Sequence, residues 1–395
     1  MARLMPEFPG LVELMKERAT LCSGVSFMSG ETMQLLGQMV FNEEIMSDLG
    51  SDFYLVSYSD LVSHLYNLCR GSGVQIKHNF VVKEVVTSAD ESPAVVSDSG
   101  VRLTADIVVG ADGKNSIVRQ VISSEEPESE DEDSFEIPGF RSSTPTPEMH
   151  EIGSAALTIP IAAMESDPDL KSLITNDRFN LWTGNGHAFS GSTCGREMYN
   201  LGLTYSFPPK PDDIDADWYD HQPLSTMEKQ LSSYHPTLQK LAKLASGCHW
   251  SIQISPNLPR YTNQTDQVVV IGDAAHCVPL NSSHNTSLAF EDAVTLGRIF
   301  SRVTSKEDIP LFLNGFNEIK RPRTRQTELA EYGGVPTQGS SGSCLGMTLH
   351  LDGADDDTLA QAWGSYVGAF NYDANDAVDE WWMNWARPMH SNGWH

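Results

Sequence analysis

The chain has 395 residues, 40% of them hydrophobic and 20% charged, an ordinary globular composition that is long enough for two domains. Its formal net charge of −27 opposes binding to nucleic acid and to anionic membranes, because both are polyanions. Six scattered cysteines without a CxxC pair argue against a metal site, and no apolar run approaches the roughly 20 residues that span a bilayer. We therefore expect a reduced, cytoplasmic protein that binds a small molecule. The oligomeric state stays open.

The first part of the chain shows helical and strand-like patterns in turn. Apolar residues at helical spacing predict a helix over 10–20 and another from Ser59, which the glycines at 71 and 73 end. The segment VQIKHNFVVKEVVTS, 74–88, alternates like a strand. TADIVV, 104–109, ends in a compact apolar run, as a buried parallel strand does.

The middle of the chain has a different texture. The acidic run EEPESEDED, 125–133, predicts a solvated loop or, alternatively, an acidic docking segment. From about 135 to 254, glycine-punctuated segments rich in aromatic and β-branched residues predict antiparallel strands. DQVVVIGDAAH, 266–276, returns to a buried strand, and a helix is expected over 287–303. We predict an α/β domain over 1–134 and 256–320, a β-rich domain over 135–255 and a helical region over 321–395.

Two segments resemble the class A FAD-dependent monooxygenases, the aromatic hydroxylases, and in particular the salicylate-hydroxylase-like enzymes of fungal secondary metabolism. ADIVVGADGKNSIVRQVI, 105–122, is similar to their Asp-Gly motif. GDAAH, 272–276, followed by Pro279 and FEDA, 290–293, is similar to their second FAD motif. The resemblance implies an α/β, FAD/NAD(P)-binding (GR2-like) fold with a β-rich substrate domain and a helical C-terminal tail.

The resemblance also implies a cofactor site. Asp273 matches the carboxylate that accepts hydrogen bonds from the ribityl hydroxyls, with Gly272 and Pro279 beside it. Asp112 and Gly113 match residues near the bound cofactor and the approach of the nicotinamide. Because both motifs follow buried strands, we expect Asp112 and Asp273 to approach the same cleft.

Three departures from the family pattern lead us to expect that FAD is lost or weakly held. The family opens with a strand, a GxGxxG loop and a helix, and we expect the fold here to be truncated at this first βαβ unit. Tyr58 stands where the family has an arginine that contacts the cofactor. The loop after Pro279 reads SSHN, 282–285, where the family has glycines, and His284 is expected to project toward the pyrimidine end of the flavin.

These features favour a flavin-independent enzyme of natural-product biosynthesis. It would catalyse a non-redox cyclisation, isomerisation or rearrangement of a bulky, largely apolar polyketide- or terpenoid-type intermediate. One alternative is an authentic FAD- and NAD(P)H-dependent monooxygenase whose first βαβ unit is missing from this sequence. A second alternative is a non-catalytic relative that only binds its ligand.

Candidate catalytic and pocket residues follow from these hypotheses. We expect His284 to pair with Asp273 as a general acid or base, with Tyr58 polarising a carbonyl and His187 as the reserve acid or base. The alternative is that His284 fills space and Asp273 caps a helix. The aromatic residues of the β-rich segments are predicted to line the substrate pocket as a set, although each alone is equally a core residue: Trp182, Phe189, Tyr199 and Tyr205.

Overall fold

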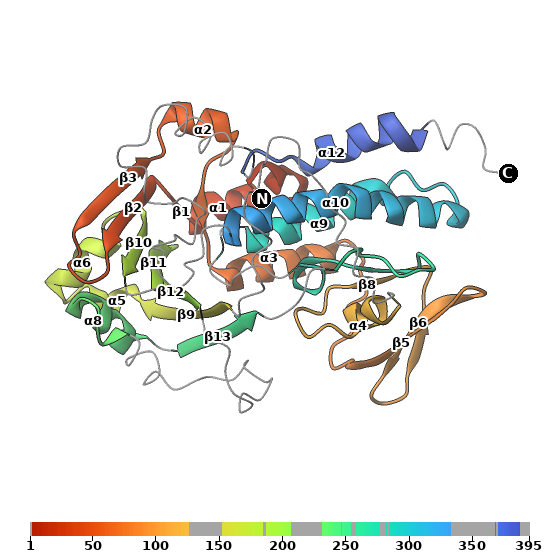
Figure 1. Ribbon diagram of the computed structural model, residues 1–395, viewed down its shortest axis with the longest axis horizontal. Helices are drawn as coiled ribbons and strands as arrows, with labels where there is room; N and C mark the ends of the chain where they lie inside the picture. The colour runs from red at the N-terminus through yellow and green to blue at the C-terminus, as the bar shows by residue number, and fades with distance from the viewer. Residues whose placement is uncertain are drawn as a thin grey trace.

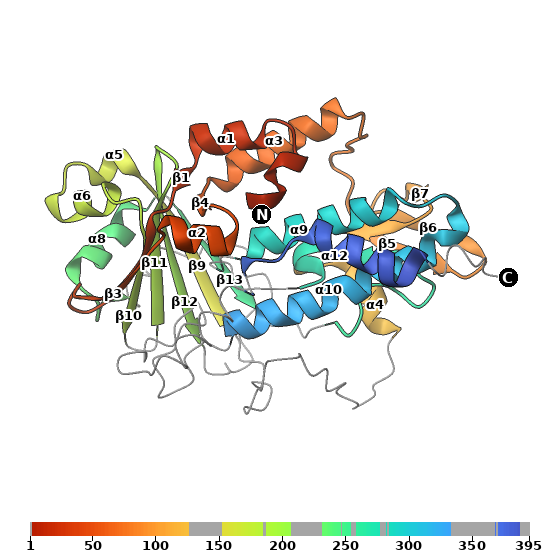
Figure 2. The same cartoon turned by 90° about the horizontal axis from the view of Figure 1, so that it is seen from above.

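The protein consists of two layered halves that share its N-terminal segment (Figure 1). The computed structural model describes residues 2–125, 152–184, 187–206, 231–245, 247–253, 258–276, 282, 284–332, 368 and 370–387. A large sheet with its covering helices forms one half, and helices with two small sheets form the other (Figures 1 and 2). Among the described residues, no helix has the length and apolar character needed to cross a membrane.

The N-terminal segment contributes to both halves. Its elements are η1 (Ala2–Glu7), α1 (Leu11–Arg18), β1 (Thr20–Leu21), β2 (Gly24–Ser29), β3 (Leu35–Val40), α2 (Glu43–Leu49), β4 (Tyr54–Leu55) and α3 (Tyr58–Gly71). The helices α1 and α3 pack through Leu11 and Leu61 into one cluster with Phe290. By contrast, β2 pairs in parallel with a strand of the large sheet, so the sheet begins well before the predicted boundary at 135. Burial of Val25 and Phe27 against that strand holds them there.

Within the residues that the structure describes, the large sheet has seven strands: β2 and β3 come from the N-terminal segment, and five come from the predicted β-rich region. They are β9 (Ile152–Pro160), β10 (Phe179–Gly184), β11 (His187–Cys194), β12 (Met198–Ser206) and β13 (Gly247–Gln253). The strand order is β13-β9-β12-β11-β10-β2-β3. Every neighbouring pair is antiparallel except β10 and β2, so the expectation of antiparallel strands in this region is confirmed.

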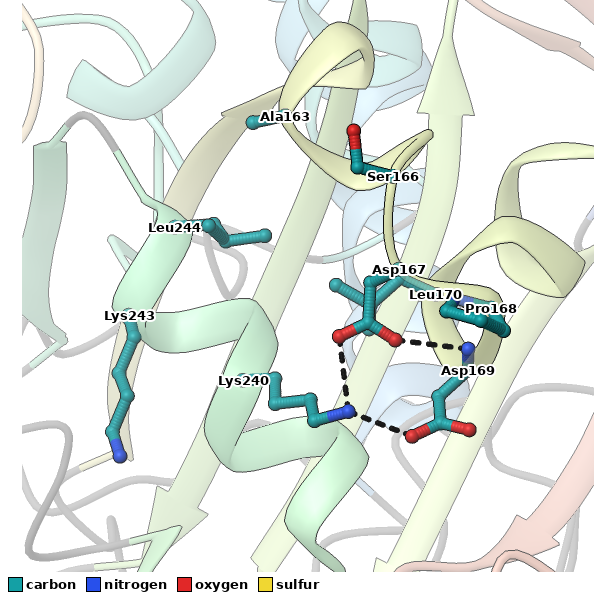
Figure 3. Close-up of a pocket in the computed structure, with 9 residues that line it drawn as sticks. All are labelled: Ala163, Ser166, Asp167, Pro168, Asp169, Leu170, Lys240, Lys243 and Leu244. Atoms are coloured by element: carbon teal, nitrogen blue, oxygen red, sulfur yellow. Dashed lines mark hydrogen bonds and ion pairs between the residues drawn. The ribbon is translucent and has the colours of Figure 1, made fainter.

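Short helices cover one face of this sheet and enclose its core. They are α5 (Ile161–Met164), α6 (Pro168–Ile174) and α8 (Pro236–Leu244). Lys240 on α8 bridges to α6 with its Nζ 2.9 Å from Asp167 and 2.7 Å from Asp169, at a shallow surface pocket (Figure 3). Both ribbon views place these helices at the end of the molecule opposite α4 (Ile117–Ser124). This pocket therefore lies away from the two predicted motifs.

The second half is built on a two-stranded parallel sheet of β8 (Val108–Gly110) and β14 (Val268–Val270). The other elements of this half are β5 (Val82–Ser88), β6 (Glu91–Ser97), β7 (Arg102–Thr104), η2 (Gly272–Ala274), α9 (Asn285–Phe300), η3 (Lys306–Asp308), α10 (Ile309–Tyr332), α12 (Ala374–Trp381) and η4 (Trp382–Ala386). The strand predicted over 74–88 begins only at Val82, which corrects the prediction for 74–81. In the described part of the chain residues 74–81 belong to no sheet, although the Val81 carbonyl accepts the Asp98 N–H at 2.9 Å.

Candidate functional site

The two predicted motifs meet at one edge of the parallel sheet. Val108 pairs with Val268 and Gly110 with Val270, and the Ile271 N–H donates to the Gly110 carbonyl at 2.9 Å. Parallel strands end at the same edge, so the turns that follow β8 and β14 lie side by side. Asp112 and Asp273, which follow these strands, therefore stand at the same edge, as the sequence analysis expected.

Asp112 caps the helix that follows it. Its carboxylate accepts hydrogen bonds from the backbone N–H groups of Ile117 and Val118, at 2.8 and 3.3 Å, and from the Ser116 hydroxyl. The first N–H groups of α4 are thereby satisfied and their partial positive charge is balanced. Gly113 next to it has a φ of +75°, and a Cβ there would meet no atom within 4 Å. The backbone at Gly113 therefore has open space beside it, while the Asp112 carboxylate is hydrogen-bonded to the start of α4.

Unlike Asp112, Asp273 does not cap a helix in its described hydrogen bonds, and it is exposed. It lies in the turn directly after β14, where Gly272 has a left-handed φ of +59°, and its side chain is exposed. The protein mass around this turn still removes part of its hydration, which raises the pKa of Asp273, while His276 and Lys114 oppose that rise. Lys114 belongs to the turn after β8, so the two motifs interact electrostatically at the shared edge.

A buried carboxylate holds the Asp273 turn from behind. Asp292 Oδ2 on α9 accepts the Gly272 N–H at 2.8 Å and lies 2.7 Å from His276 Nε2. Asp292 and His276 are both almost completely buried. Burial alone would raise the pKa of Asp292, but His276 and Lys320 outweigh that effect and hold it at about 2. The turn that carries Asp273 is therefore fixed by an ionised group.

This carboxylate belongs to a larger buried ion cluster. Lys320 Nζ lies 3.1 Å from both Asp292 and Glu291, and Arg323 forms two hydrogen bonds with Glu291 at 3.0 and 2.9 Å. The Tyr372 ring covers the Arg323 guanidinium, 4.5 Å from its centre. Opposite charges and hydrogen bonds compensate for the loss of hydration in such a cluster. It connects α9, α10 and the segment before α12.

Arg119 provides a second attachment of the turn. It is buried on α4, and its Nη1 donates to the carbonyls of Ala274 and Ala275 at 3.0 and 3.1 Å. Sequence reasoning did not select Arg119, Asp292 or Lys320. Two of them lie inside the motifs that the sequence analysis quoted: Arg119 is the last residue of GADGKNSIVR, and Asp292 is the aspartate of FEDA. Charged residues on an otherwise apolar helix face are the pattern that would have identified them.

The other predicted site residues lie in different surroundings. His284 precedes α9, is buried, and packs its ring against Phe370 with 4.4 Å between ring centroids. Tyr58 is the first residue of α3, and 74% of it is exposed. The expected roles of these two residues beside Asp273 therefore stay predictions. Pro279 and the side chain of His187 lie outside the described residues.

The predicted pocket aromatics are core residues as the chain stands. Trp182, Phe189 and Tyr199 are fully buried among β-strands and the helices α5, α6 and α8. Strand register explains this placement: Trp182 pairs with Phe189, so both project to the helix-covered face. Their expected role as a pocket wall stays a prediction. The side chain of Tyr205 lies outside the described residues.

The shared edge fits FAD on one side. Asp273 is exposed, and Gly113 leaves open space beside its own backbone, with no atom within 4 Å of a Cβ placed there. These features suit the polyol and ring of a flavin. The N-terminus of α4 suits a phosphate less well, because Asp112 already occupies its N–H groups.

The amino-acid sequence is similar to those of several known proteins. No family model matches the chain. It is 22% identical over 289 residues to the FAD-dependent monooxygenase OpS4 of Beauveria bassiana, covering 72% of this chain and 62% of that protein. It is 26% identical over 306 residues to the asperlicin C monooxygenase of Petromyces alliaceus, covering 73% and 60%. The chain therefore spans about 60% of the length of these two curated relatives.

Solved structures agree on the fold. The crystal structure of FqzB has a TM-score of 0.70 at 17% identity, covering 97% of this chain and 82% of FqzB. A salicylate hydroxylase substrate complex has a TM-score of 0.66 at 16% identity, covering 94% and 86%. The predicted FAD-monooxygenase type of α/β fold and the resemblance to salicylate-hydroxylase-like enzymes of fungal secondary metabolism are confirmed. The chain is similar in sequence to FAD-dependent monooxygenases and shares the fold of these solved structures.

Proposed function

We propose that this protein is a FAD-dependent monooxygenase-type enzyme of natural-product biosynthesis that acts on a bulky, largely apolar small molecule. The observation that carries the proposal is the position of the exposed Asp273 at the edge shared by the two motifs. Relatives named asperlicin C monooxygenase and hispidin-3-hydroxylase support the substrate class. The relatives' names also favour a flavin over the flavin-free reading that the sequence alone suggested.

The described residues have defined tasks in such an enzyme. A bound flavin would supply the reduction by a nicotinamide and the transfer of one oxygen atom to the substrate. Asp273 would accept hydrogen bonds from the cofactor's hydroxyls. Asp292 and Arg119 would keep the turn in place through the Gly272 N–H and the Ala274 carbonyl. Lys114, beside Asp273, would limit the accumulation of negative charge at this edge.

A flavin-independent, non-redox reaction is the second candidate, and one observation favours it. Because burial raises the pKa of Asp273, its carboxyl keeps a transferable proton to a higher pH than an ordinary aspartate does. Such an acid could promote a cyclisation, isomerisation or rearrangement of the same class of substrate. In that reaction Asp273 would act on the substrate itself. Tyr58 and His284 would have no part in binding a cofactor.

Flavin binding separates the two candidates. The visible absorption spectrum of the purified protein is recorded, and FAD is then titrated by fluorescence quenching. The monooxygenase proposal expects saturable binding, and Asp273→Asn should weaken it about tenfold, the loss of roughly 1.4 kcal/mol for hydrogen bonds to a charged acceptor. Asp169→Asn, at an exposed carboxylate on α6, is the matched control. No FAD binding at all, together with turnover of a polyketide-type substrate, would establish the non-redox candidate, and a lack of both would leave a binding protein.

A further inference from the structure

The outermost strand of the large sheet, β3, has a neighbour on one side only. Among the described residues its single partner is β2, and both ribbon views show β3 on the margin of the sheet, leading to α2 (Figures 1 and 2). Just after β3, the Phe41 N–H donates to the Ser23 carbonyl at 3.0 Å. Backbone groups of an antiparallel strand alternate between its two sides, so those of Gln38 and Val40 face away from β2. The Val40 carbonyl accepts the Asn42 N–H at 3.0 Å, which leaves the Val40 N–H and both groups of Gln38 for an outer partner.

This edge lacks most of the features that protect the edge of a sheet. Exposed edges ordinarily carry charges, prolines or bulges that block further pairing. The strand reads LLGQMV, without a charge or a proline. A register shift between Phe27 and Met28 makes its start irregular, but the pairing that follows is regular up to Val40. Leu36 is 51% exposed and Val40 48% exposed. The edge is therefore open to a further strand.

A small hydrophobic cluster ends in open space at this edge. Phe27 of β2 is buried in the cluster, whereas Met39 of β3 and Phe41 just after it are only partly buried. Gly37 stands opposite Phe27 in the strand register, and a Cβ placed on Gly37 would meet no atom within 4 Å. Apolar side chains of an added strand would continue the cluster there and remove it from water.

A groove with an acidic lining begins where β3 ends. It has a volume of about 740 Å³ and lies along α2 and the residues on either side of that helix. Phe41 and Met46 give it an apolar part, and Glu43 and Asp52 are its charged side chains. A segment that pairs along β3 and continues past Val40 reaches the wall formed by Phe41 and Glu43. A positive charge at that end of the segment would meet carboxylates.

The charges around the edge have one sign. Residues 19–69 contain no lysine or arginine, and exposed carboxylates lie at both ends of β3, Glu31 before it and Glu43 and Glu44 after it. The cation Arg3 reaches the end of α2, where its guanidinium donates to a main-chain carbonyl at 2.9 Å. An extended segment with an apolar middle and basic ends is complementary to this pattern.

We propose that the open edge of β3 binds an extended segment of a partner polypeptide that is apolar at alternate positions and basic at its ends. Main-chain hydrogen bonds to Gln38 and Val40 supply affinity, and side chains of the segment cover the cluster at Gly37. A second copy of the chain fits less well, because two-fold pairing of β3 with itself would place the acidic ends of the two strands opposite each other. Specific dimers also bury about 1,200–2,000 Å² in total, more than two such strands provide. The inference goes beyond the proposed reaction and does not depend on it.

The test measures binding of synthetic peptides to the full chain. The probe peptide has alternating valine and threonine with a pair of lysines at each end, and the matched peptide has glutamates in place of the lysines. We expect saturable binding of the lysine peptide by isothermal titration calorimetry, with a dissociation constant on the order of 10–100 µM at low ionic strength. The glutamate peptide should bind at least about tenfold more weakly. In hydrogen–deuterium exchange, the Gln38 and Val40 amides should exchange quickly in the free chain and become protected in the complex.

Variants separate the edge from other exposed apolar surface. Gln38→Pro removes an outward N–H and leaves the bonds of its neighbours to β2, and Leu36→Lys places a charge at the edge. Each should weaken binding of the lysine peptide at least about tenfold, and Glu43→Gln should weaken it several-fold. Met383→Lys makes the same charge change at an exposed apolar residue just after α12, in the half of the molecule away from β3, and should leave binding unchanged. Circular dichroism of each variant checks that the fold is retained.

Several results would overturn the proposal. They are no binding at about 1 mM lysine peptide, equal binding of the two peptides, and unchanged binding in Gln38→Pro and Leu36→Lys. Concentration-dependent dimerisation in sedimentation velocity that Gln38→Pro abolishes would assign the edge to a second copy, against the proposal. Asp273→Asn should leave peptide binding unchanged, so failure of FAD binding and failure of peptide binding are separate results.

Discussion

Asp292 Oδ2 accepts the backbone N–H of Gly272 and also contacts His276 Nε2, at 2.8 and 2.7 Å. One buried carboxylate therefore fixes both ends of the turn that carries Asp273. Because Lys320 pairs with the second oxygen of Asp292, the turn is also coupled to α10. The position of Asp273 thus depends on a buried residue of α9.

Replacing Asp292 by asparagine should destabilise the protein strongly. The change removes the charge opposite Lys320 and His276 while both stay buried, which costs about 3–5 kcal/mol when a buried pair is broken. Urea unfolding followed by circular dichroism measures the loss. The control Asp379→Asn weakens the pairs of an exposed carboxylate with Arg298 and Arg302 and should cost less than about 1 kcal/mol. Equal losses in the two variants would contradict a central role for Asp292.

Acid should unfold the protein by protonating this cluster. Burial raises the pKa of Glu291 and Asp292, but the neighbouring cations outweigh it and lower each to about 2, from 4.5 and 3.8. Carboxyls with a depressed folded pKa stabilise above their unfolded values and lose that stability as pH falls toward 2. The expected loss is roughly 2–3 kcal/mol per group. Free energies of unfolding at pH 6 and pH 2.5 test this, and a flat profile would count against ionised carboxylates in the core.

Asp273→Asn should leave stability equal or slightly higher at neutral pH. The folded protein raises the pKa of this carboxyl by withdrawing hydration, so folding favours its neutral form, and its charge opposes folding above that pKa. An amide removes the charge while it keeps the size. Thermal melting at pH 7 and at pH 4 is the measurement: any advantage of the variant should shrink at the lower pH. A lower melting temperature at pH 7 would show that Asp273 has a structural role.

The core of the large sheet should reject a single added methyl group at Gly191. A Cβ there would overlap the Tyr199 hydroxyl and the Trp182 ring, which are both fully buried. Overpacking of this kind costs about 1–3 kcal/mol, so Gly191→Ala should lower the free energy of unfolding by that amount. Gly37→Ala on β3 is the matched control, because a Cβ there meets no atom within 4 Å. A tolerated Gly191→Ala would mean that these aromatics have space around them, as a pocket wall would.

The amino-acid sequence by itself determined the fold class and the two motifs. Compact apolar runs such as VVV before Gly272 identify buried parallel strands, because only a sheet covered on both faces keeps such runs from water. The expected proximity of Asp112 and Asp273 rested on these two runs together with the family resemblance, which assigns both motifs to one cofactor site, and the parallel pairing of β8 with β14 brings them to one edge. The antiparallel strands of the β-rich region follow in the same way from glycine spacing and β-branched residues.

Only the tertiary structure decided which side chains serve the site. Period-2 alternation shows that Trp182 and Tyr199 share a face, but not that helices cover this face, because those helices come from distant parts of the chain. Asp292 pairs with His276, 16 positions earlier in the chain, and with Lys320, 28 positions later, so local sequence pattern does not reveal either contact. Likewise, residues 74–77 alternate as a strand does, yet a strand forms only where a neighbour completes its hydrogen bonds, and sequence pattern does not report the presence of that neighbour.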